Sequence, residues 1–339
     1  MRSNSKIKSI FVFWSILLIL ITLSLSTTVF AGQYSIKELT ISGGTIGGGT
    51  NLMANALSAI AVKYLGVNST VLANATMAQV NVLQDGQAEI STAMAFQTYD
   101  AYKGIGDWKD KPFPDVRLLL PGDANPWHMA VLKNSDIYDI KDLVGKRVVV
   151  GKAGFTAEFV TKQLFKDLDM DYDKIIPSNL GHEDAAAALL SGKVDAYIII
   201  SSPPQATFTE ITRAHDIRII GLTEEEIAIV IKKAELPGVK RYILPAGIYK
   251  GNDEDILTPD IAIVYSCIAS LPEDFVYGLV KNFWENLEFA ALQWAKVSTF
   301  KIEDIQAFTS SAPWHIGAYK YYKEKGLVIP ENMIPPEAK

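Results

Sequence analysis

Apolar and polar positions along the chain follow two periods, one typical of helices and one typical of buried strands. From residue 53 to residue 64, apolar side chains return every three or four positions and form one face of a helix. Short apolar runs elsewhere have the length and the β-branched content of buried strands. We expect strands at 39–41, 90–96, 147–150 and 194–200, and further helices at 77–84, 157–167 and 183–190. Alternating strands and helices predict an α/β fold with mostly parallel sheets flanked by helices.

This order of elements occurs twice, at a constant offset. Four pairs of similar residues are 106 positions apart: Thr50 and Thr156, Leu83 and Leu189, Gly86 and Gly192, Glu89 and Asp195. The shared string Leu-x-x-Gly-x-x-acid is short, so chance similarity is the alternative. The common register favours two related lobes. Because ligands bind beyond the carboxyl ends of parallel strands, we expect a ligand cleft between the lobes.

Each repeat begins with a glycine-rich loop between a strand and a helix. The first runs from Ser42 to Asn51 and contains five glycines, and the second runs from Gly151 to Thr156. Glycine allows backbone N–H groups to approach a ligand closely. A helix that starts after such a loop adds unpaired N–H groups and the positive end of its dipole. The two loops therefore predict a site for a carboxylate or a phosphate.

Residues in these loops and at the following strand ends are the candidate ligand contacts. They are Thr45, Gly49, Thr50, Asn51 and Gln97 in the first lobe, and Gly154, Phe155, Thr156, Ser201 and Ser202 in the second. Turn formation and helix capping are the alternative roles of the Thr and Asn side chains. Phe155 either forms a wall of the pocket or fills the core, and we favour the wall. Trp127 is a further candidate for the pocket wall, with packing at a hinge as an equal alternative.

Residues 1–31 have the features of a signal peptide. Three basic residues precede an apolar run from Ile10 to Leu25, and the small residues Val29 and Ala31 stand before a cut at Gly32. An uncleaved anchor helix is the alternative. No later segment has about 18 uninterrupted apolar residues, so we expect a soluble mature chain in the periplasm or another extracytoplasmic space. Its length of about 308 residues fits two α/β domains.

Composition and charge exclude several classes of function. The formal charge is −6, and removal of residues 1–31 makes it −9. An acidic chain without a basic stripe argues against nucleic-acid binding. The single cysteine, Cys267, excludes an internal disulfide and lies in an apolar run, where we expect it to be buried.

Motifs for catalysis, cofactors and metals are missing from the sequence. It contains no Walker A motif, no clean G-x-G-x-x-G and no G-x-S-x-G elbow. The four histidines are scattered without metal-ligand spacing, and we expect each to be a hydrogen-bonded structural residue. We therefore expect no catalytic residues, no metal, no cofactor and no enzyme activity. An enzyme on the same two-lobed fold and a receptor that signals to a kinase are the alternatives.

Several strings resemble those of the TAXI-type solute receptors of TRAP transporters. The loop at 42–50 is similar to that family's Thr-Gly-Gly-Thr-Gly-Gly-Thr, and Leu-Pro-Ala-Gly-Ile-Tyr at 244–249 is the most specific match. Residues 126–128, 141–148 and 315–326 also match family strings. Phe155 stands where that family usually has a glycine, so the resemblance implies a pocket more aromatic than the family norm.

The resemblance implies a two-lobed type II periplasmic binding protein fold. Such a receptor closes over a small anionic solute, an amino acid such as glutamate or a dicarboxylate or other organic acid. It then delivers the solute to the TRAP membrane permease, which an ion gradient drives. We expect a monomer with a discontinuous first lobe at 32–123 and 241–339, a second lobe at 124–240, and hinge crossings near 120–127 and 238–246.

Overall fold

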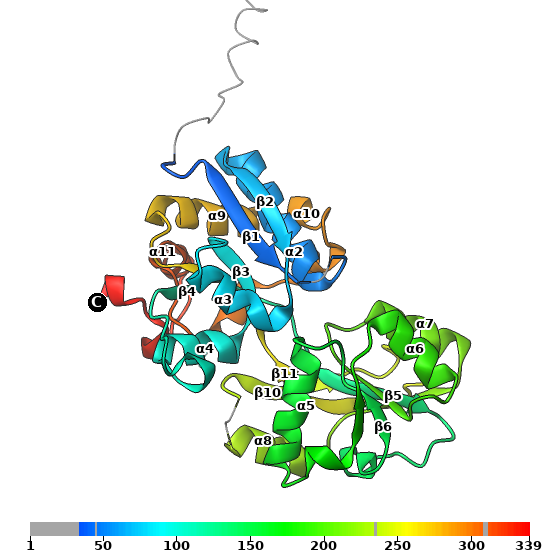
Figure 1. Ribbon diagram of the computed structural model, residues 1–339. Helices are drawn as coiled ribbons and strands as arrows, with labels where there is room; N and C mark the ends of the chain where they lie inside the picture. Colours follow the sequence, from blue (N-terminus) through cyan, green and yellow to red (C-terminus); the bar gives the residue numbers. More distant parts are fainter. Residues whose placement is uncertain (1–33, 45, 234–235, 308–310) are drawn as a thin grey trace, which may run out of the picture.

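The computed structural model describes residues 34–339 except residues 45, 234–235 and 308–310 (Figure 1). The signal segment predicted at 1–31 and the candidate Thr45 therefore lie outside the described residues. The described chain forms two lobes, each built around a five-stranded sheet, with a separate two-stranded sheet. Within this part of the chain, no helix is long and apolar enough to cross a membrane.

The first lobe contains a sheet with strand order β2-β1-β3-β12-β4. The strands are β1 (Glu38–Gly43), β2 (Asn68–Ala73), β3 (Ile90–Met94), β4 (Val116–Pro121) and β12 (Ile263–Ile268). β12 is antiparallel to both of its neighbours, while β1 is parallel to β2 and β3. The helices of this lobe are α2 (Gly49–Ile60), α3 (Gln79–Gln84), α4 (Ala95–Lys103), α9 (Glu273–Glu285), α10 (Leu287–Ala290) and α11 (Ile316–Glu324).

The second lobe repeats this topology, with strand order β7-β6-β8-β5-β9. The strands are β5 (Trp127–Leu132), β6 (Arg147–Val149), β7 (Ile176–Ser178), β8 (Ala196–Ile200) and β9 (Ile217–Ile220). β5 is antiparallel to β8, as β12 is to β3 in the first lobe. Its helices are α5 (Thr156–Asp167), α6 (His182–Leu190), α7 (Ala206–Ala214) and α8 (Glu224–Lys233). The predicted two-lobed α/β fold is confirmed, but the sheets are mixed instead of mostly parallel, because β12 and β5 each run antiparallel to both of their neighbours.

The repeat predicted from the 106-residue offset extends to individual hydrogen bonds. The Glu89 carboxylate accepts a hydrogen bond from the backbone N–H of Thr40 on β1, at 2.7 Å. In the second lobe the Asp195 carboxylate accepts one from the backbone N–H of Arg147 on β6, at 2.8 Å. Both acids thus bind the strand that precedes the glycine loop. Two related lobes, rather than chance similarity, explain the shared string.

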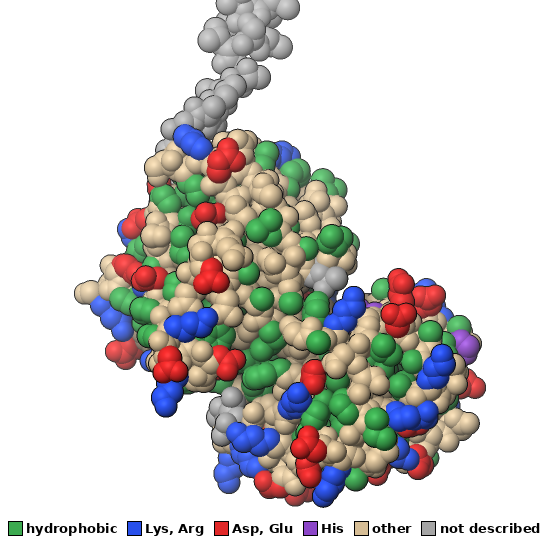
Figure 2. Space-filling view, in the orientation of Figure 1, with side chains coloured by type: hydrophobic (Ala, Val, Ile, Leu, Met, Phe, Trp, Pro, Cys, Tyr) green, Lys and Arg blue, Asp and Glu red, His purple; other side chains and the backbone are tan. Residues whose placement is uncertain are grey.

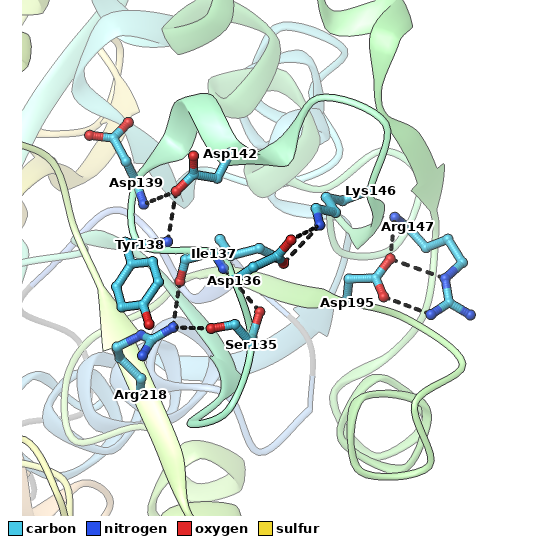
Figure 3. A network of polar contacts seen from close by, with 10 residues as sticks. All are labelled: Ser135, Asp136, Ile137, Tyr138, Asp139, Asp142, Lys146, Arg147, Asp195 and Arg218. Atoms are coloured by element: carbon cyan, nitrogen blue, oxygen red, sulfur yellow. Dashed lines mark hydrogen bonds and ion pairs between the residues drawn. The ribbon is translucent and has the colours of Figure 1, made fainter.

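A polar network orders the connection between β5 and β6 (Figure 3). The Asp142 carboxylate accepts hydrogen bonds from two successive backbone N–H groups, at Tyr138 and Asp139. Arg218 donates to the backbone carbonyls of Ser135 and Ile137 at 2.8 Å, and Arg147 pairs with Asp195 at the other side of the network. The string matched at 141–148 therefore has a structural role at this connection.

The chain passes between the lobes at 121–127 and again at 261–263, between β11 (Ile256–Ile261) and β12. β11 pairs with β10 (Val239–Leu244), and both strands pack on the second lobe, where the Leu222 N–H donates to the Leu257 carbonyl. A Cβ atom at Gly221 would lie 1.9 Å from that carbonyl oxygen, so this contact requires glycine. We propose that the second lobe extends to about residue 261, instead of ending at 240 as the sequence suggested.

The predicted elements form, and the boundary that matters for the site is wrong. The predicted strand at 90–96 ends at Met94, and Phe96 and Gln97 belong to the first turn of α4. A short apolar run fits a buried strand and a buried helical turn equally well. The spacing of apolar residues therefore does not show where β3 ends and α4 begins. Cys267 is fully buried, as predicted.

Candidate ligand-binding site

A cleft of about 210 Å³ lies between the two lobes, and Figure 2 shows apolar side chains where the lobes meet. The residues that line it come from both lobes and from the crossing between β4 and β5. They are Gly48, Gly49, Thr50, Thr76, Met94, Asn125, Gly151, Lys152, Phe155, Thr156, Ala157, Leu180, Gly181, His182, Tyr197, Ile198, Ile199, Ile200, Ser201, Ser202, Ile263, Tyr265 and Trp294.

Three helices begin at this cleft. The residues that precede α2, α5 and α6 are Gly48, Phe155 and Gly181, and none of them provides a side-chain cap for its helix. The first N–H groups of a helix have no partner within the helix, and the helix dipole is positive at this end. Helix N-termini from both lobes therefore give the cleft the character of an anion site.

Threonine hydroxyls connect the lobes at the cleft. The Oγ1 atoms of Thr76 and Thr156 are 3.0 Å apart and hydrogen-bonded, although the two residues belong to different lobes. Thr156 is the first residue of α5, and Phe155 occupies the N-cap position. The Thr156 hydroxyl therefore does not cap its own helix, and it is available to a partner across the cleft.

Lys152 is the one lysine or arginine among the residues that line the cleft. Its side chain crosses the N-terminus of α6, where a Cβ atom at Gly181 would lie 2.8 Å from the Lys152 Cε. No carboxylate of the described residues forms an ion pair with it. The Lys152 ammonium group thus adds a positive charge to the three helix N-termini.

His182 lies beside Lys152 at the start of α6. Its Nδ1 is 2.5 Å from the Tyr197 hydroxyl, and both residues line the cleft. Partial removal from water, and then the charge of Lys152, lower the pKa of His182. Both effects favour the uncharged imidazole, which offers the cleft a hydrogen-bonding group without charge.

Aromatic and aliphatic side chains form the remaining walls. Phe155, predicted as a pocket wall, lines the cleft, and Trp294 lines it from the first lobe. A Cβ atom at Gly49 would lie 2.9 Å from the Trp294 ring, so this approach depends on glycine. The walls also include Leu180 and the end of β8 at 198–200. The cleft therefore suits a solute that has an apolar body.

Contacts between the lobes also lie beside the cleft. Lys296 of the first lobe pairs with Asp123 and donates to the Ser202 hydroxyl and, at 2.8 Å, to the Pro203 carbonyl of the second lobe. The Phe96 and Phe159 rings stack across the lobes with centroids 5.3 Å apart. These contacts must break if the lobes separate, so the structure describes a closed arrangement.

A model of the NMT1-like family matches residues 41–326. The chain belongs to the NMT1-like family.

Solved structures with a similar fold share little sequence with this NMT1-like chain. The periplasmic aliphatic sulphonate binding protein SsuA from Escherichia coli is 13% identical with a TM-score of 0.46, over 88% of this chain and 96% of that one. A P235GK mutant of ArgBP from T. maritima is 14% identical with a TM-score of 0.46, over 77% and 94%. A putative L-cystine ABC transporter from Listeria monocytogenes is 16% identical with a TM-score of 0.45, over 76% and 96%. Likeness at this level carries no argument about the ligand.

Six of the residues predicted from the sequence line the cleft of this NMT1-like protein: Gly49, Thr50, Phe155, Thr156, Ser201 and Ser202. The Ser202 hydroxyl binds Asp123 and Lys296, so it holds the lobes together. Ser201 is half-buried.

The other predicted residues lie behind the cleft or beside it. The Gln97 amide donates to the Met77 carbonyl at 3.0 Å, because Gln97 lies in a helix instead of at a strand end. Trp127 is fully buried, and its indole N–H donates to the Thr161 hydroxyl. Its role is therefore packing, which was the alternative to a pocket wall. Asn51 is buried in α2, where its backbone carbonyl accepts from Asn55. Gly154 is exposed with a φ of 79° and does not line the cleft.

Several residues that line the NMT1-like cleft were not predicted from the sequence, although the 106-residue repeat relates some of them to each other. At the same offset of 106, Thr76 corresponds to His182 and Met94 corresponds to Ile200, and all four line the cleft. Trp294, Asn125 and Tyr265 have no such counterpart signal. Among the described residues, no group of three or more His, Cys, Asp and Glu side chains could hold a metal ion.

Proposed function

We propose that this protein is an extracytoplasmic solute-binding protein that captures a small anionic solute between its lobes. The observation that carries the proposal is the convergence of three uncapped helix N-termini and Lys152 on one cleft lined by both lobes. Backbone N–H groups and hydroxyls bind the anion, and Lys152 supplies the opposite charge. The solute is an amino acid such as glutamate, a dicarboxylate or another organic acid.

Binding is coupled to closure of the lobes. Thr50 and Thr156 lie on opposite lobes, so one solute can contact both only when the lobes are together. A solute that binds the closed arrangement more tightly shifts the population toward it. The two crossings at 121–127 and 261–263 are the positions where the backbone can rotate.

The resemblance to TAXI-type receptors supports a role in transport. In this proposal residues 1–31 direct the chain across the membrane, and the closed, loaded monomer docks on a TRAP membrane permease that an ion gradient drives. The proposal is binding without turnover, since the sequence contains none of the catalytic motifs named above. A sensory receptor that reports its ligand to a kinase would use the same cleft.

The proposal is tested by measuring affinity for anions and neutral solutes. Calorimetry with carboxylates, amino acids and sugars should find carboxylates that bind, and a solute at 100 times its Kd should stabilise the fold by about 2.7 kcal/mol. Lys152→Met should weaken that binding at least about tenfold, because a hydrogen bond to a charged group contributes about 1.5–3 kcal/mol. Lys193→Met is the control, since Lys193 is exposed and does not line the cleft.

Two results would contradict the proposal. One is binding of sugars without binding of any carboxylate. The other is equal affinity for the bound carboxylate in the Lys152 variant and in the Lys193 control.

A further inference from the structure

Tyr265 presents an unpaired hydroxyl at the cleft. It lies on β12, only 1% of its surface is exposed, and it lines the cleft. Within the described residues, its hydroxyl has no hydrogen-bond partner. A solute that fills the cleft takes this hydroxyl out of water and must supply a hydrogen bond in return, so a polar group of the solute is its natural partner.

Asn125 presents a second such group from the crossing between β4 and β5. It is 5% exposed and lines the cleft, and its backbone N–H donates to the Asp260 carboxylate at 2.7 Å. Its side-chain amide has one weak contact, with the Met94 sulfur at 3.8 Å. The backbone carbonyl of Asn125 accepts a hydrogen bond from the Ile261 N–H at 3.3 Å, but the side-chain Oδ1 has no partner in the described part of the chain. An amide offers two donors and an acceptor, so it matches a neutral polar group well.

These two residues, which we call the neutral pair, lie apart from Lys152. Lys152 follows β6, whereas Asn125 precedes β5, and β8 runs between these two strands. Neighbouring strands are about 4.8 Å apart, so the two backbone positions are separated by roughly 10 Å across the sheet. A small solute can therefore reach Lys152 with one end and the neutral pair with the other.

The surroundings of the neutral pair disfavour a second carboxylate on the solute. Asp260 is 1% exposed and pairs with Lys240 at 3.6 Å, and Asp123 pairs with Lys296. Each of these lysines already has an acidic partner. The two acids and two lysines cancel in charge, so a carboxylate beside Asn125 would lose its hydration without gaining net positive charge.

We propose that the solute carries one carboxylate, bound near Lys152, and an uncharged hydrogen-bonding group at its other end, bound by Asn125 and Tyr265. The inference rests on the proposed function and narrows it to monocarboxylates that end in an amide, a hydroxyl or a carbonyl. It also assigns Asn125 and Tyr265 as residues that determine specificity against dicarboxylates.

Matched pairs of solutes test this assignment, because each pair differs by an amide in place of a carboxylate. We would measure the affinity of the purified protein for succinamate and succinate, and for glutamine and glutamate. In at least one pair the amide should bind about tenfold more tightly or better. Tyr265→Phe and Asn125→Leu should each weaken binding of the amide by three- to tenfold and should reduce the difference within that pair.

A control separates specificity from folding. Tyr265→Phe should leave the melting temperature of the empty protein nearly unchanged, because the hydroxyl has no partner to lose. Tyr64→Phe removes a hydroxyl outside the cleft and should change neither affinity nor preference.

The outcomes distinguish this inference from the proposed function. Tighter binding of succinate and glutamate, or unchanged amide affinity in both variants, would overturn the inference while a carboxylate site that depends on Lys152 still stands. If no carboxylate of any kind binds, the proposed function fails and this inference fails with it.

Discussion

The hydrogen bond between Thr76 and Thr156 makes a specific prediction about the Thr156 hydroxyl. Thr156→Val removes this hydroxyl and nearly keeps the shape of the side chain. The residue is 5% exposed and its Oγ1 is 3.0 Å from the Thr76 Oγ1 of the other lobe. Loss of a neutral hydrogen bond costs about 0.5–1.5 kcal/mol, and loss of one to a carboxylate costs about 1.5–3 kcal/mol. Since about 1.4 kcal/mol is tenfold in affinity, we expect the Kd to rise about tenfold if the hydroxyl binds the solute.

Calorimetry on the variant measures this change, and thermal melting of the empty variant measures stability. Because Phe155, and not Thr156, occupies the N-cap of α5, the helix should lose little stability. Thr212→Val is the matched control: the Thr212 hydroxyl donates to the Phe208 carbonyl in α7, outside the cleft. The control should lower the melting temperature without changing affinity. Unaltered affinity with a lower melting temperature in the Thr156 variant would refute the reasoning and make Thr156 a structural residue.

Three further predictions follow from named contacts. Burial lowers the pKa of His128 from 6.5 to about 4, so its contribution to folding stability is complete above about pH 6.5 and is lost as the pH falls toward 4. The loss amounts to about 3 kcal/mol of folding stability at most. The free energy of unfolding, measured with denaturant from pH 7 to pH 4, should fall less steeply for His128→Gln than for the unmodified protein. An equally steep fall would show that His128 does not cause this pH dependence. Lys296→Met should lower the affinity for every carboxylate that binds by a similar factor, because Lys296 joins the lobes without lining the cleft. A loss of affinity confined to one solute would instead indicate that Lys296 contacts that solute directly. Gly49→Ala should reduce affinity by displacing the Trp294 ring, which the added Cβ atom would approach to 2.9 Å; unchanged affinity would mean that Trp294 does not shape the cleft.

The sequence predicts well those features that local period and composition control. The four helices and four strands of the repeat follow from the spacing of apolar residues, whereas the remaining elements, among them β5 and β12, carry no prediction. Gly86 and Gly192, predicted as equivalent, have φ angles of 66° and 69°, as expected for equivalent turns. Elements that repeat at a fixed offset can be placed without knowledge of tertiary contacts.

The rest of the site depends on contacts between distant parts of the chain. Asn125 and Tyr265 are 140 positions apart and line the same cleft, because Asn125 lies at the first crossing between the lobes and Tyr265 lies on β12, which follows the second crossing. Trp294 reaches the cleft from an irregular segment that carries no periodic signal. Gln97 illustrates the opposite error: the strand ends two residues earlier than predicted, so Gln97 lies in α4 with a buried amide instead of contacting the cleft.

Small-angle scattering tests most directly the central claim that the lobes close over a small carboxylate. The radius of gyration would be measured for the empty protein and at a saturating concentration of the tightest-binding carboxylate found by calorimetry. We predict a smaller radius in the loaded protein, and a loaded curve that agrees with the closed arrangement in which Thr76 contacts Thr156. An unchanged radius of gyration at saturation would contradict capture by closure.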